Sequence, residues 1–238
     1  MKKRQKVRLG ILFFTFLLFP AIFYYFSPYL IIDASVRGII NGSFVVFALL
    51  FTSSLILGRA FCGWLCPAGG CQEMMIPIRN RQIHKGNWIK WFLWVPWILA
   101  IGFATVKAGG YRQIDFFYQT SHGLSISNLY SWVTYFFVLL LIVLPAFLIG
   151  RRSFCHHLCW MAPFMIVGRT VRNVGRWPAL KLTAKSDVCT HCRTCTAHCP
   201  MSLPVEEMVN SEKMEHHECI LCGTCVDGCN AKAIRYSL

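Results

Sequence analysis

The chain has 238 residues, of which 55% are hydrophobic and 14% are charged, whereas a soluble domain carries about 25% charged residues. Its net charge of +14 does not indicate nucleic-acid binding, because most basic residues lie in short loops between long apolar runs. The thirteen cysteines are an odd number, which disfavours a closed set of disulfides. Their spacing favours metal-bound thiolates in a reducing compartment.

Four apolar segments are long enough to cross a bilayer, which takes about 20 residues of helix. We predict these spans at residues 9–32, 39–58, 88–106 and 129–150. Pro20 should kink the first span. We expect that span to stay in place as a signal anchor, because no A-x-A cleavage site follows it.

Positively charged residues predict the orientation of these spans. Lys and Arg are concentrated at the N-terminus, after the second span and after the fourth, and the other two loops carry only Arg37, Lys107 and Arg112. Positive residues stay on the cytoplasmic side of a membrane. We therefore expect a multi-pass protein of a prokaryotic cytoplasmic (inner) membrane, with both termini in the cytoplasm.

The second and fourth spans end in similar sequences, LILGRAFCGWLCP and AFLIGRRSFCHHLC. Each places Phe-Cys-x3-Cys shortly after Gly-Arg, and the first cysteines, Cys62 and Cys155, are 93 positions apart. This similarity predicts a duplicated two-span unit with a pseudo-symmetric core.

The end of the chain contains two further cysteine runs, CTHCRTCTAHCP from Cys189 and CILCGTCVDGCN from Cys219. In such a Cys-x2-Cys-x2-Cys-x3-Cys run, the first three cysteines hold one [4Fe-4S] cluster and the fourth holds the other cluster. The two predicted ligand sets are Cys189, Cys192, Cys195 and Cys229, and Cys219, Cys222, Cys225 and Cys199. A pair of zinc sites is the weaker alternative, because zinc prefers separated Cys-x2–4-Cys pairs.

The predicted fold class is mainly α: a four-transmembrane-helix bundle with an internal two-span repeat, followed by a small α+β ferredoxin domain of the bacterial two-cluster type. We divide the chain into a membrane domain at residues 1–164, a basic interfacial linker at 165–186 and the ferredoxin domain at 187–238. The last part is too small to fold on core burial alone, so clusters should supply much of its folding energy. Its acidic segment, residues 206–218, is predicted to be a solvated helix or turn.

The repeated membrane motif supplies a third group of cysteines, Cys62, Cys66, Cys155 and Cys159. In a helix, an i, i+4 pair has Cβ atoms about 5–6 Å apart, which suits two ligands of one cluster better than a disulfide. We favour a third [4Fe-4S] cluster held by all four. Redox dithiols, a transient copper site, and plain packing cysteines are the alternatives. Cys71 has no partner in this scheme and is read as structural.

Charged and titratable side chains flank these motifs. His156 and His157 could bind a quinone carbonyl or donate to cluster sulfur, or could face lipid headgroups. Arg59 and Arg151 are read as anchors of the span ends, although an arginine near a cluster would raise its reduction potential.

With these motifs the chain resembles the membrane-bound polyferredoxins, a family that includes the NapH-type subunit of periplasmic nitrate reduction and the C-terminal half of NosR. The resemblance rests on the four spans, the paired Cys-x3-Cys motifs and the two-cluster tail. One feature departs from the pattern: Trp160 follows Cys159 and the proline comes only at Pro163, which puts the turn of the second motif in doubt. The resemblance implies electron exchange between the membrane quinone pool and a redox partner.

We therefore expect an electron-transfer subunit of the quinol dehydrogenase type, with quinone, membrane lipid and further redox subunits as partners. The sequence contains no nucleophile–base pair, phosphate-binding glycine loop or paired carboxylates, so no catalytic residue is assigned. The alternative is a maturation or regulatory protein that uses its clusters to reduce or sense copper or a thiol at the membrane motifs.

Overall fold

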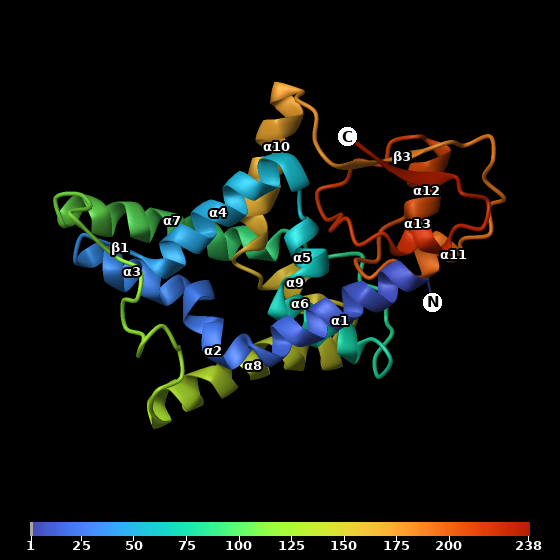
Figure 1. Cartoon of the computed structure of the whole chain (residues 1–238). Coiled ribbons are helices and arrows are strands. Elements are labelled where there is room, and N and C mark those ends of the chain that lie inside the picture. Colours follow the sequence, from blue (N-terminus) through green and yellow to red (C-terminus); the bar gives the residue numbers. More distant parts are fainter. Residues whose placement is uncertain (1) are drawn as a thin grey trace.

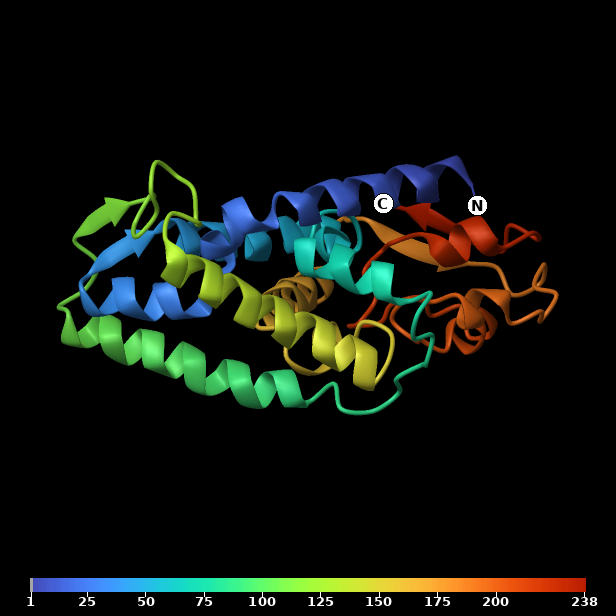
Figure 2. The ribbon, with the colours of Figure 1, turned by 90° about the horizontal axis from the view of Figure 1, so that it is seen from below.

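The computed structural model describes residues 2–238 and is mainly helical (Figure 1). An elongated helical part lies at one end and the cysteine-rich tail at the other, with the N-terminal helix reaching the tail (Figure 2). The helical part contains α1 (Lys3–Leu17), α2 (Phe19–Ile22), the 3-10 helix η1 (Phe23–Phe26), α3 (Pro28–Val36), α4 (Gly42–Leu57), α5 (Ala60–Trp64), α6 (Pro67–Met75), α7 (Ile89–Lys107), α8 (Leu129–Leu148), α9 (Ser153–His157) and α10 (Ala162–Gly175).

Two small sheets complete the fold. Strand β1 (Ile39–Asn41) pairs in parallel with β2 (Gln113–Asp115) at the far end of the helical part. In the tail, β3 (Lys181–Ala184) pairs antiparallel with β4 (Ile234–Ser237), and α11 (Thr194–Ala197), α12 (Val205–Asn210) and α13 (Thr224–Gly228) lie between these strands in the chain. Most of the segment predicted as a linker therefore belongs to α10 and β3.

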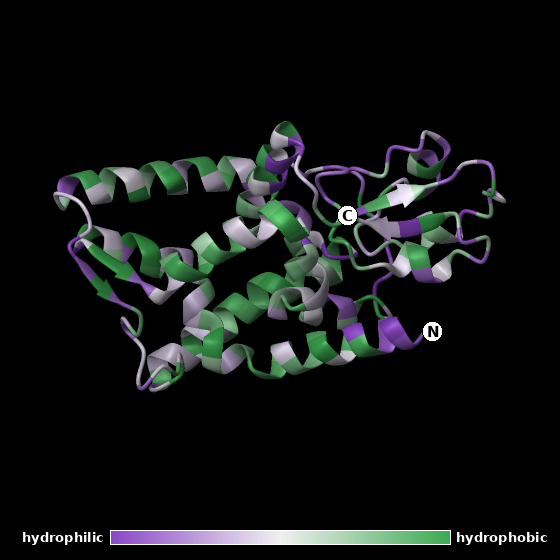
Figure 3. Cartoon of the chain, turned by 45° about the horizontal axis from the view of Figure 1, so that its top comes forward, coloured by the Kyte–Doolittle hydropathy of each residue, from purple (hydrophilic) through white to green (hydrophobic). Residues whose placement is uncertain are grey.

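The third and fourth predicted spans are each a single long helix. Helices α7 and α8 are long and apolar enough to cross a membrane. Much of their surface is apolar and exposed, including Phe92 and Leu99 on α7 and Val133 and Phe137 on α8. Hydrophobic residues predominate over the long helices, whereas hydrophilic residues gather on the tail and its loops (Figure 3). These helices are therefore suited to contact lipid.

The first predicted span is not one helix. Helix α1 and the segment Phe19–Phe26 are bent by 59° relative to each other, at the kink predicted for Pro20. A second break follows at Ser27, whose side chain accepts a hydrogen bond from Leu30 N and caps α3. Since Pro20 and Pro28 both lack a backbone donor, the chain forms three helical pieces where the hydropathy pattern predicts one.

The second predicted span is a short helix. Helix α4 has 16 residues and ends where Gly58 adopts a positive φ of 55°. At 1.5 Å per residue it extends about 24 Å, less than the roughly 30 Å of a bilayer core. The four-span bundle and the cytoplasmic position of both termini therefore stay predictions.

Candidate iron–sulfur sites

Two cavities in the tail are each lined by four cysteines. Their cysteine linings are Cys199, Cys219, Cys222 and Cys225 in one, which we call the inner quartet, and Cys189, Cys192, Cys195 and Cys229 in the other, the outer quartet. In each quartet three cysteines come from one run and the fourth comes from the other run. This is the grouping that the spacing predicts.

The two runs wrap their cavities with the same backbone turns. His191 and Arg193 adopt positive φ angles of 53° and 58°, and the equivalent residues Leu221 and Gly223 adopt 50° and 74°. Left-handed backbone is costly for residues other than glycine and is found where the local structure demands it. Successive turns of this kind point backbone N–H groups inward, where they can meet an anionic group.

The inner quartet is buried and the outer quartet lies near the surface. All four inner cysteines are at most 9% exposed, whereas Cys192 is exposed. Burial, with a further contribution from Cys222, raises the pKa of the Cys199 thiol to about 12. A thiolate at this position therefore needs a compensating positive charge, which the iron of a cluster would supply.

The cysteine thiols are not joined in disulfides. All thirteen cysteines are free. Across residues 2–238, no three His, Cys, Asp or Glu side chains lie close enough to hold one metal ion. The preference for clusters over zinc therefore rests on the cysteine spacing, because zinc prefers separated Cys-x2–4-Cys pairs.

The membrane cysteines lie on two helix–turn units instead of two continuous helices. Cys62 is in α5, but Cys66 has extended backbone and caps α6, because a residue before proline avoids helical backbone. The Cys66 sulfur accepts a hydrogen bond from Gly69 N at 3.4 Å. The helical i, i+4 geometry considered for Cys62 and Cys66 is therefore not the geometry that the chain adopts.

The second motif forms the same turn although its proline is displaced. Cys66 N donates to Phe61 O at 3.0 Å, and Cys159 N donates to Phe154 O at 2.9 Å. Helix α10 begins at Ala162 with Pro163 in its first turn. The doubt raised by Trp160 is thus removed, and the internal repeat extends to backbone hydrogen bonds.

The four membrane thiols, which we call the membrane quartet, lie together in a buried environment. Each is at most 4% exposed. Burial raises the pKa of the Cys66 thiol well above its ordinary value, and nearby Cys62, Cys155 and Cys159 raise it further. Burial also raises the pKa of Cys62, while the positive charge of Arg59 opposes that shift. These side chains could carry thiolates only beside additional positive charge.

Buried nitrogen atoms near the membrane quartet have no hydrogen-bond partner. Within residues 2–238 they are Nε and Nη2 of Arg59, which are donors, and Nε2 of His156. The Arg59 side chain is fully buried, and negative charge on Cys62 and Cys159 would favour its charged form. Buried donors almost always find a partner, and the sulfur atoms of a cluster would provide acceptors. The residues present therefore fit an iron–sulfur group.

The two neighbouring histidines differ in availability. His156 Nδ1 lies 2.6 Å from Asn87 Oδ1, and burial lowers the pKa of His156 to about 3, so the ring is neutral. His157 has both ring nitrogens near backbone carbonyls, those of Ser153 at 2.9 Å and Lys85 at 3.1 Å. With Nδ1 donating to Asn87, the neutral His156 ring leaves Nε2 as an acceptor, which could accept a hydrogen bond from a quinol hydroxyl but could not donate to a quinone carbonyl or to cluster sulfur.

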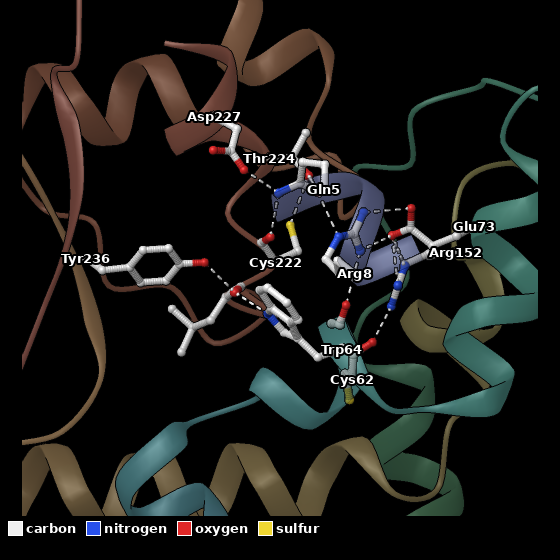
Figure 4. A network of polar contacts seen from close by, with 12 residues as sticks. Gln5, Arg8, Cys62, Trp64, Glu73, Arg152, Cys222, Thr224, Asp227 and Tyr236 are labelled. Carbon is white, nitrogen blue, oxygen red and sulfur yellow. Dashed lines mark hydrogen bonds and ion pairs between the residues drawn. The ribbon is translucent and has the colours of Figure 1, made fainter. Parts of the chain in front are cut away.

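Helix α6 and the second motif fix the backbone of the first motif (Figure 4). The buried carboxylate of Glu73 pairs with Arg8 at 3.1 Å and with Arg152 at 2.8 Å. Arg8 donates to the carbonyl of Gly63 at 3.1 Å, and Arg152 donates to the carbonyl of Cys62 at 2.8 Å. One carboxylate thus orients the two arginines that hold the Cys62–Gly63 segment.

The N-terminal helix also binds the tail. Gln5 Nε2 donates to the Cys222 carbonyl at 3.0 Å and to Asp227 at 2.7 Å, and Arg4 pairs with Asp227 at 2.9 Å. Trp64 Nε1, next to Gly63, donates to the Leu221 carbonyl at 3.1 Å. The first membrane motif and the second tail run are therefore in direct contact.

The arginines predicted to anchor the span ends contact the tail. Arg59 and Lys90 pair with Glu218 at 2.7 and 2.5 Å, and Arg151 donates to the carbonyls of Ala197 at 2.7 Å and Cys199 at 3.3 Å. Glu218 is 5% exposed, so the prediction that residues 206–218 are solvated is wrong at this position. The repeated Gly-Arg motif therefore supplies one docking arginine from each unit.

A large apolar cavity adjoins the membrane quartet. It lies between the N-terminal helices and α8, and its volume is about 360 Å³. Its lining includes Pro67 and Ala68, which follow Cys66, Phe154, which precedes Cys155, and Trp160, which follows Cys159. Further lining comes from aromatic rings and a few polar groups, Phe19, Phe23, Tyr24, Ser27, Gln119, Tyr130, Thr134 and Phe137 among them.

Comparison with known proteins identifies both cysteine regions. A family described as a 4Fe-4S binding domain matches residues 41–86 and again residues 130–175, which are the two repeat units. A family described as a 4Fe-4S dicluster domain matches residues 188–234. No solved structure matches the chain.

Several curated proteins are similar over most of this chain. An uncharacterized protein of Methanocaldococcus jannaschii is 27% identical, covering 84% of this chain and 81% of its own length. The methylamine utilization ferredoxin-type protein MauN of Paracoccus denitrificans is 24% identical, covering 84% and 68%. The protein named putative electron transport protein YccM, of Escherichia coli, is 26% identical, covering 78% of this chain and 53% of its own length. This chain thus spans about half of YccM.

Proposed function

Because the chain belongs to the membrane-bound polyferredoxin family, we propose that it passes single electrons between the quinone pool and a redox partner. The observation that carries the proposal is the direct contact between the first membrane motif, which holds two of the buried quartet, and the cysteine run that supplies most of the inner cavity of the tail. A bound [4Fe-4S] cluster supplies one-electron chemistry. We assign one such cluster to each tail quartet and a third to the membrane quartet.

The residues around these quartets are suited to hold and tune iron–sulfur groups. The buried inner and membrane quartets exclude water, and Arg59 and Arg152 place positive charge beside the membrane quartet. Positive charge and hydrogen bonds to sulfur favour the reduced form of a cluster and raise its potential. The docking ion pairs keep the tail against the membrane quartet, so the distance between sites stays fixed.

The apolar cavity supports a quinone as the lipid-soluble partner. Its size and aromatic lining suit a ring with an isoprenoid tail, and three of the four membrane cysteines are sequence neighbours of lining residues. Oxidation of a quinol to a quinone releases two electrons and two protons. The chain offers several one-electron sites, so the two electrons can be accepted one at a time.

Metal analysis tests the cluster assignment. Full-length protein purified without oxygen should contain about twelve irons and as much acid-labile sulfide per chain, at four irons per cubane. A redox titration followed by electron paramagnetic resonance should resolve three centres. Colourless protein with zinc in the tail and no paramagnetic signal on reduction would reject the proposal.

A cavity-filling pair of variants tests the quinone assignment. Val138 lines the cavity on α8, whereas Val133 on the same helix is 60% exposed and does not line it. Val138→Trp should abolish reduction of the clusters by a quinol while dithionite still reduces them fully. Val133→Trp should behave like the unmodified chain. Equal quinol-driven reduction in both variants would exclude this cavity as the quinone site.

One contact favours the second candidate function, maturation or sensing of copper. The thioether sulfur of Met165 lies 4.0 Å from Cys62 Sγ, and soft thiolate and thioether ligands select Cu(I). In that case the membrane quartet would hold copper, and the metal analysis would give about eight irons together with copper.

A further inference from the structure

The contacts between the tail and the helical part give the two tail quartets different positions. We infer that the inner quartet is the one that exchanges electrons with the membrane quartet, across a seam formed by Gly63 and Trp64, and that the outer quartet is the exit to a soluble redox partner. The inference rests on the proposed function and adds to it the order of the sites and the residues that set their separation.

The seam is a close backbone contact. A Cβ atom added at Gly63 would lie 2.4 Å from the Ile220 carbonyl oxygen and 3.4 Å from Cys222 Cα and Cβ, closer than real side chains approach a backbone oxygen. Gly63 directly follows Cys62 of the membrane quartet, and Cys222 belongs to the inner quartet. Only glycine permits this approach, so residue 63 brings the two quartets together.

Hydrogen bonds hold the same contact from both sides. Trp64 Nε1 and the Tyr236 hydroxyl donate to the Leu221 carbonyl at 3.1 and 2.8 Å, and Gln5 donates to the carbonyl of Cys222 at 3.0 Å. Arg169 donates to the Cys219 carbonyl at 2.9 Å. The residues that carry the inner quartet are thus attached through their backbone to the helical part.

The outer quartet has the opposite surroundings. Cys192 is exposed, and Cys189, Cys195 and Cys229 are only partly buried. The Arg193 side chain beside it is 80% exposed. A partner protein can approach this end without displacing any part of the helical domain.

Variants at two equivalent threonines allow the signal of each tail cluster to be identified by a shift in its potential. Thr224 Oγ1 lies 3.4 Å from the sulfur of Cys222, and Thr194 occupies the equivalent place after Cys192 in the first run. Each threonine follows its cysteine by two positions. Since a hydrogen bond to sulfur raises a cluster's potential, Thr224→Val should lower the potential of the inner cluster, and Thr194→Val that of the outer cluster.

Solvent accessibility of the labelled clusters tests the order. Power saturation of the reduced full-length protein is measured with and without an aqueous dysprosium chelate, which speeds the relaxation of nearby spins. We expect the chelate to speed the relaxation of the signal that Thr194→Val shifts. The relaxation of the signal that Thr224→Val shifts should stay unchanged. A chelate effect that is equal for both signals, or larger for the second, would overturn the inference.

Crowding the seam tests the role of Gly63. Gly63→Ala should raise amide hydrogen exchange at residues 219–222 several-fold and slow quinol-driven reduction of the tail, with iron content and dithionite reduction unchanged. Gly70→Ala is the matched control, because its added Cβ would also lie 2.4 Å from a backbone oxygen, that of Leu12, away from the tail. Trp64→Phe, which removes only one hydrogen bond, should show a smaller rise in exchange.

Exchange in Gly63→Ala that matches the unmodified chain would refute the seam. Loss of quinol oxidation in the unmodified chain would instead count against the proposed quinone partner.

Discussion

Arg59 Nη1 lies 2.7 Å from the carboxylate of Glu218, the residue directly before Cys219. Arg59 follows the first repeat helix α4, and Glu218 precedes the second cysteine run, so this pair joins two parts of the chain separated by 159 positions. Lys90 of α7 contacts the same carboxylate. Because all three side chains are buried, the tail is docked through charges that have few alternative partners.

Removal of the Glu218 charge should loosen the tail. Glu218→Gln leaves Arg59 and Lys90 buried without a counter-ion, and breaking a buried ion pair costs about 3–5 kcal/mol. We expect the midpoint for thermal loss of cluster absorbance to fall by roughly 10 °C or more. Glu207→Gln makes the same chemical change on the exposed face of α12 and should leave the midpoint unchanged. Similar midpoints for the two variants would show that the buried pair does not hold the tail.

Acid should remove the stabilisation that the Glu218 carboxylate provides. Although burial alone would raise the pKa of Glu218, Arg59 and Lys90 lower it to about 2, compared with about 4.3 in an unfolded chain. The carboxylate therefore stabilises the fold fully above about pH 4.3, and this stabilisation is lost as the pH falls toward 2. The difference in thermal midpoint between the unmodified chain and Glu218→Gln, followed by tryptophan fluorescence in detergent, should narrow between pH 5 and pH 3. A difference that stays constant over this range would contradict the assigned pKa.

Local spacing made the tail sites predictable. Cysteines two or three residues apart can only line a small volume, and the repeated left-handed positions at His191 and Leu221 follow from that requirement. Helices α7 and α8 were predictable for a similar reason, since each is one uninterrupted apolar run.

The docking contacts were not predictable from the sequence. Glu218 lies in an acidic segment that favours solvent exposure, and its partners Arg59 and Lys90 resemble ordinary membrane-flanking cations. The role of Glu73 in orienting Arg8 and Arg152 did have a signal, because Glu73 is one of only three acidic residues among the first 186. The kink at Pro20 was predicted, but the second break, at Ser27, was missed because hydropathy averages over Pro28.

A comparison of two buried cysteines tests the third cluster. Cys66 belongs to the membrane quartet, whereas Cys71, five positions later, is 6% exposed and is assigned to packing. Cys66→Ser should lower the iron content from about twelve to about eight per chain, because a hydroxyl is a poor ligand for cluster iron. Cys71→Ser should keep all the iron. Full iron content in Cys66→Ser, or an equal loss in Cys71→Ser, would remove the membrane cluster from the assignment.

The fourth cysteine of each run lines the cavity formed by the other run, and this crossing gives the sharpest test of the ligand sets in the tail. Cys199 belongs to the first run but lines the inner cavity, and Cys229 belongs to the second run but lines the outer cavity. If the fourth cysteine crosses over, Cys199→Ser should alter the electron paramagnetic resonance signal whose potential Thr224→Val lowers. Cys229→Ser should alter the signal that Thr194→Val shifts. If each run instead closed its own cluster, the two serine variants would show the reverse pattern, because Cys199 would then share a cluster with Cys192 and Cys229 with Cys222.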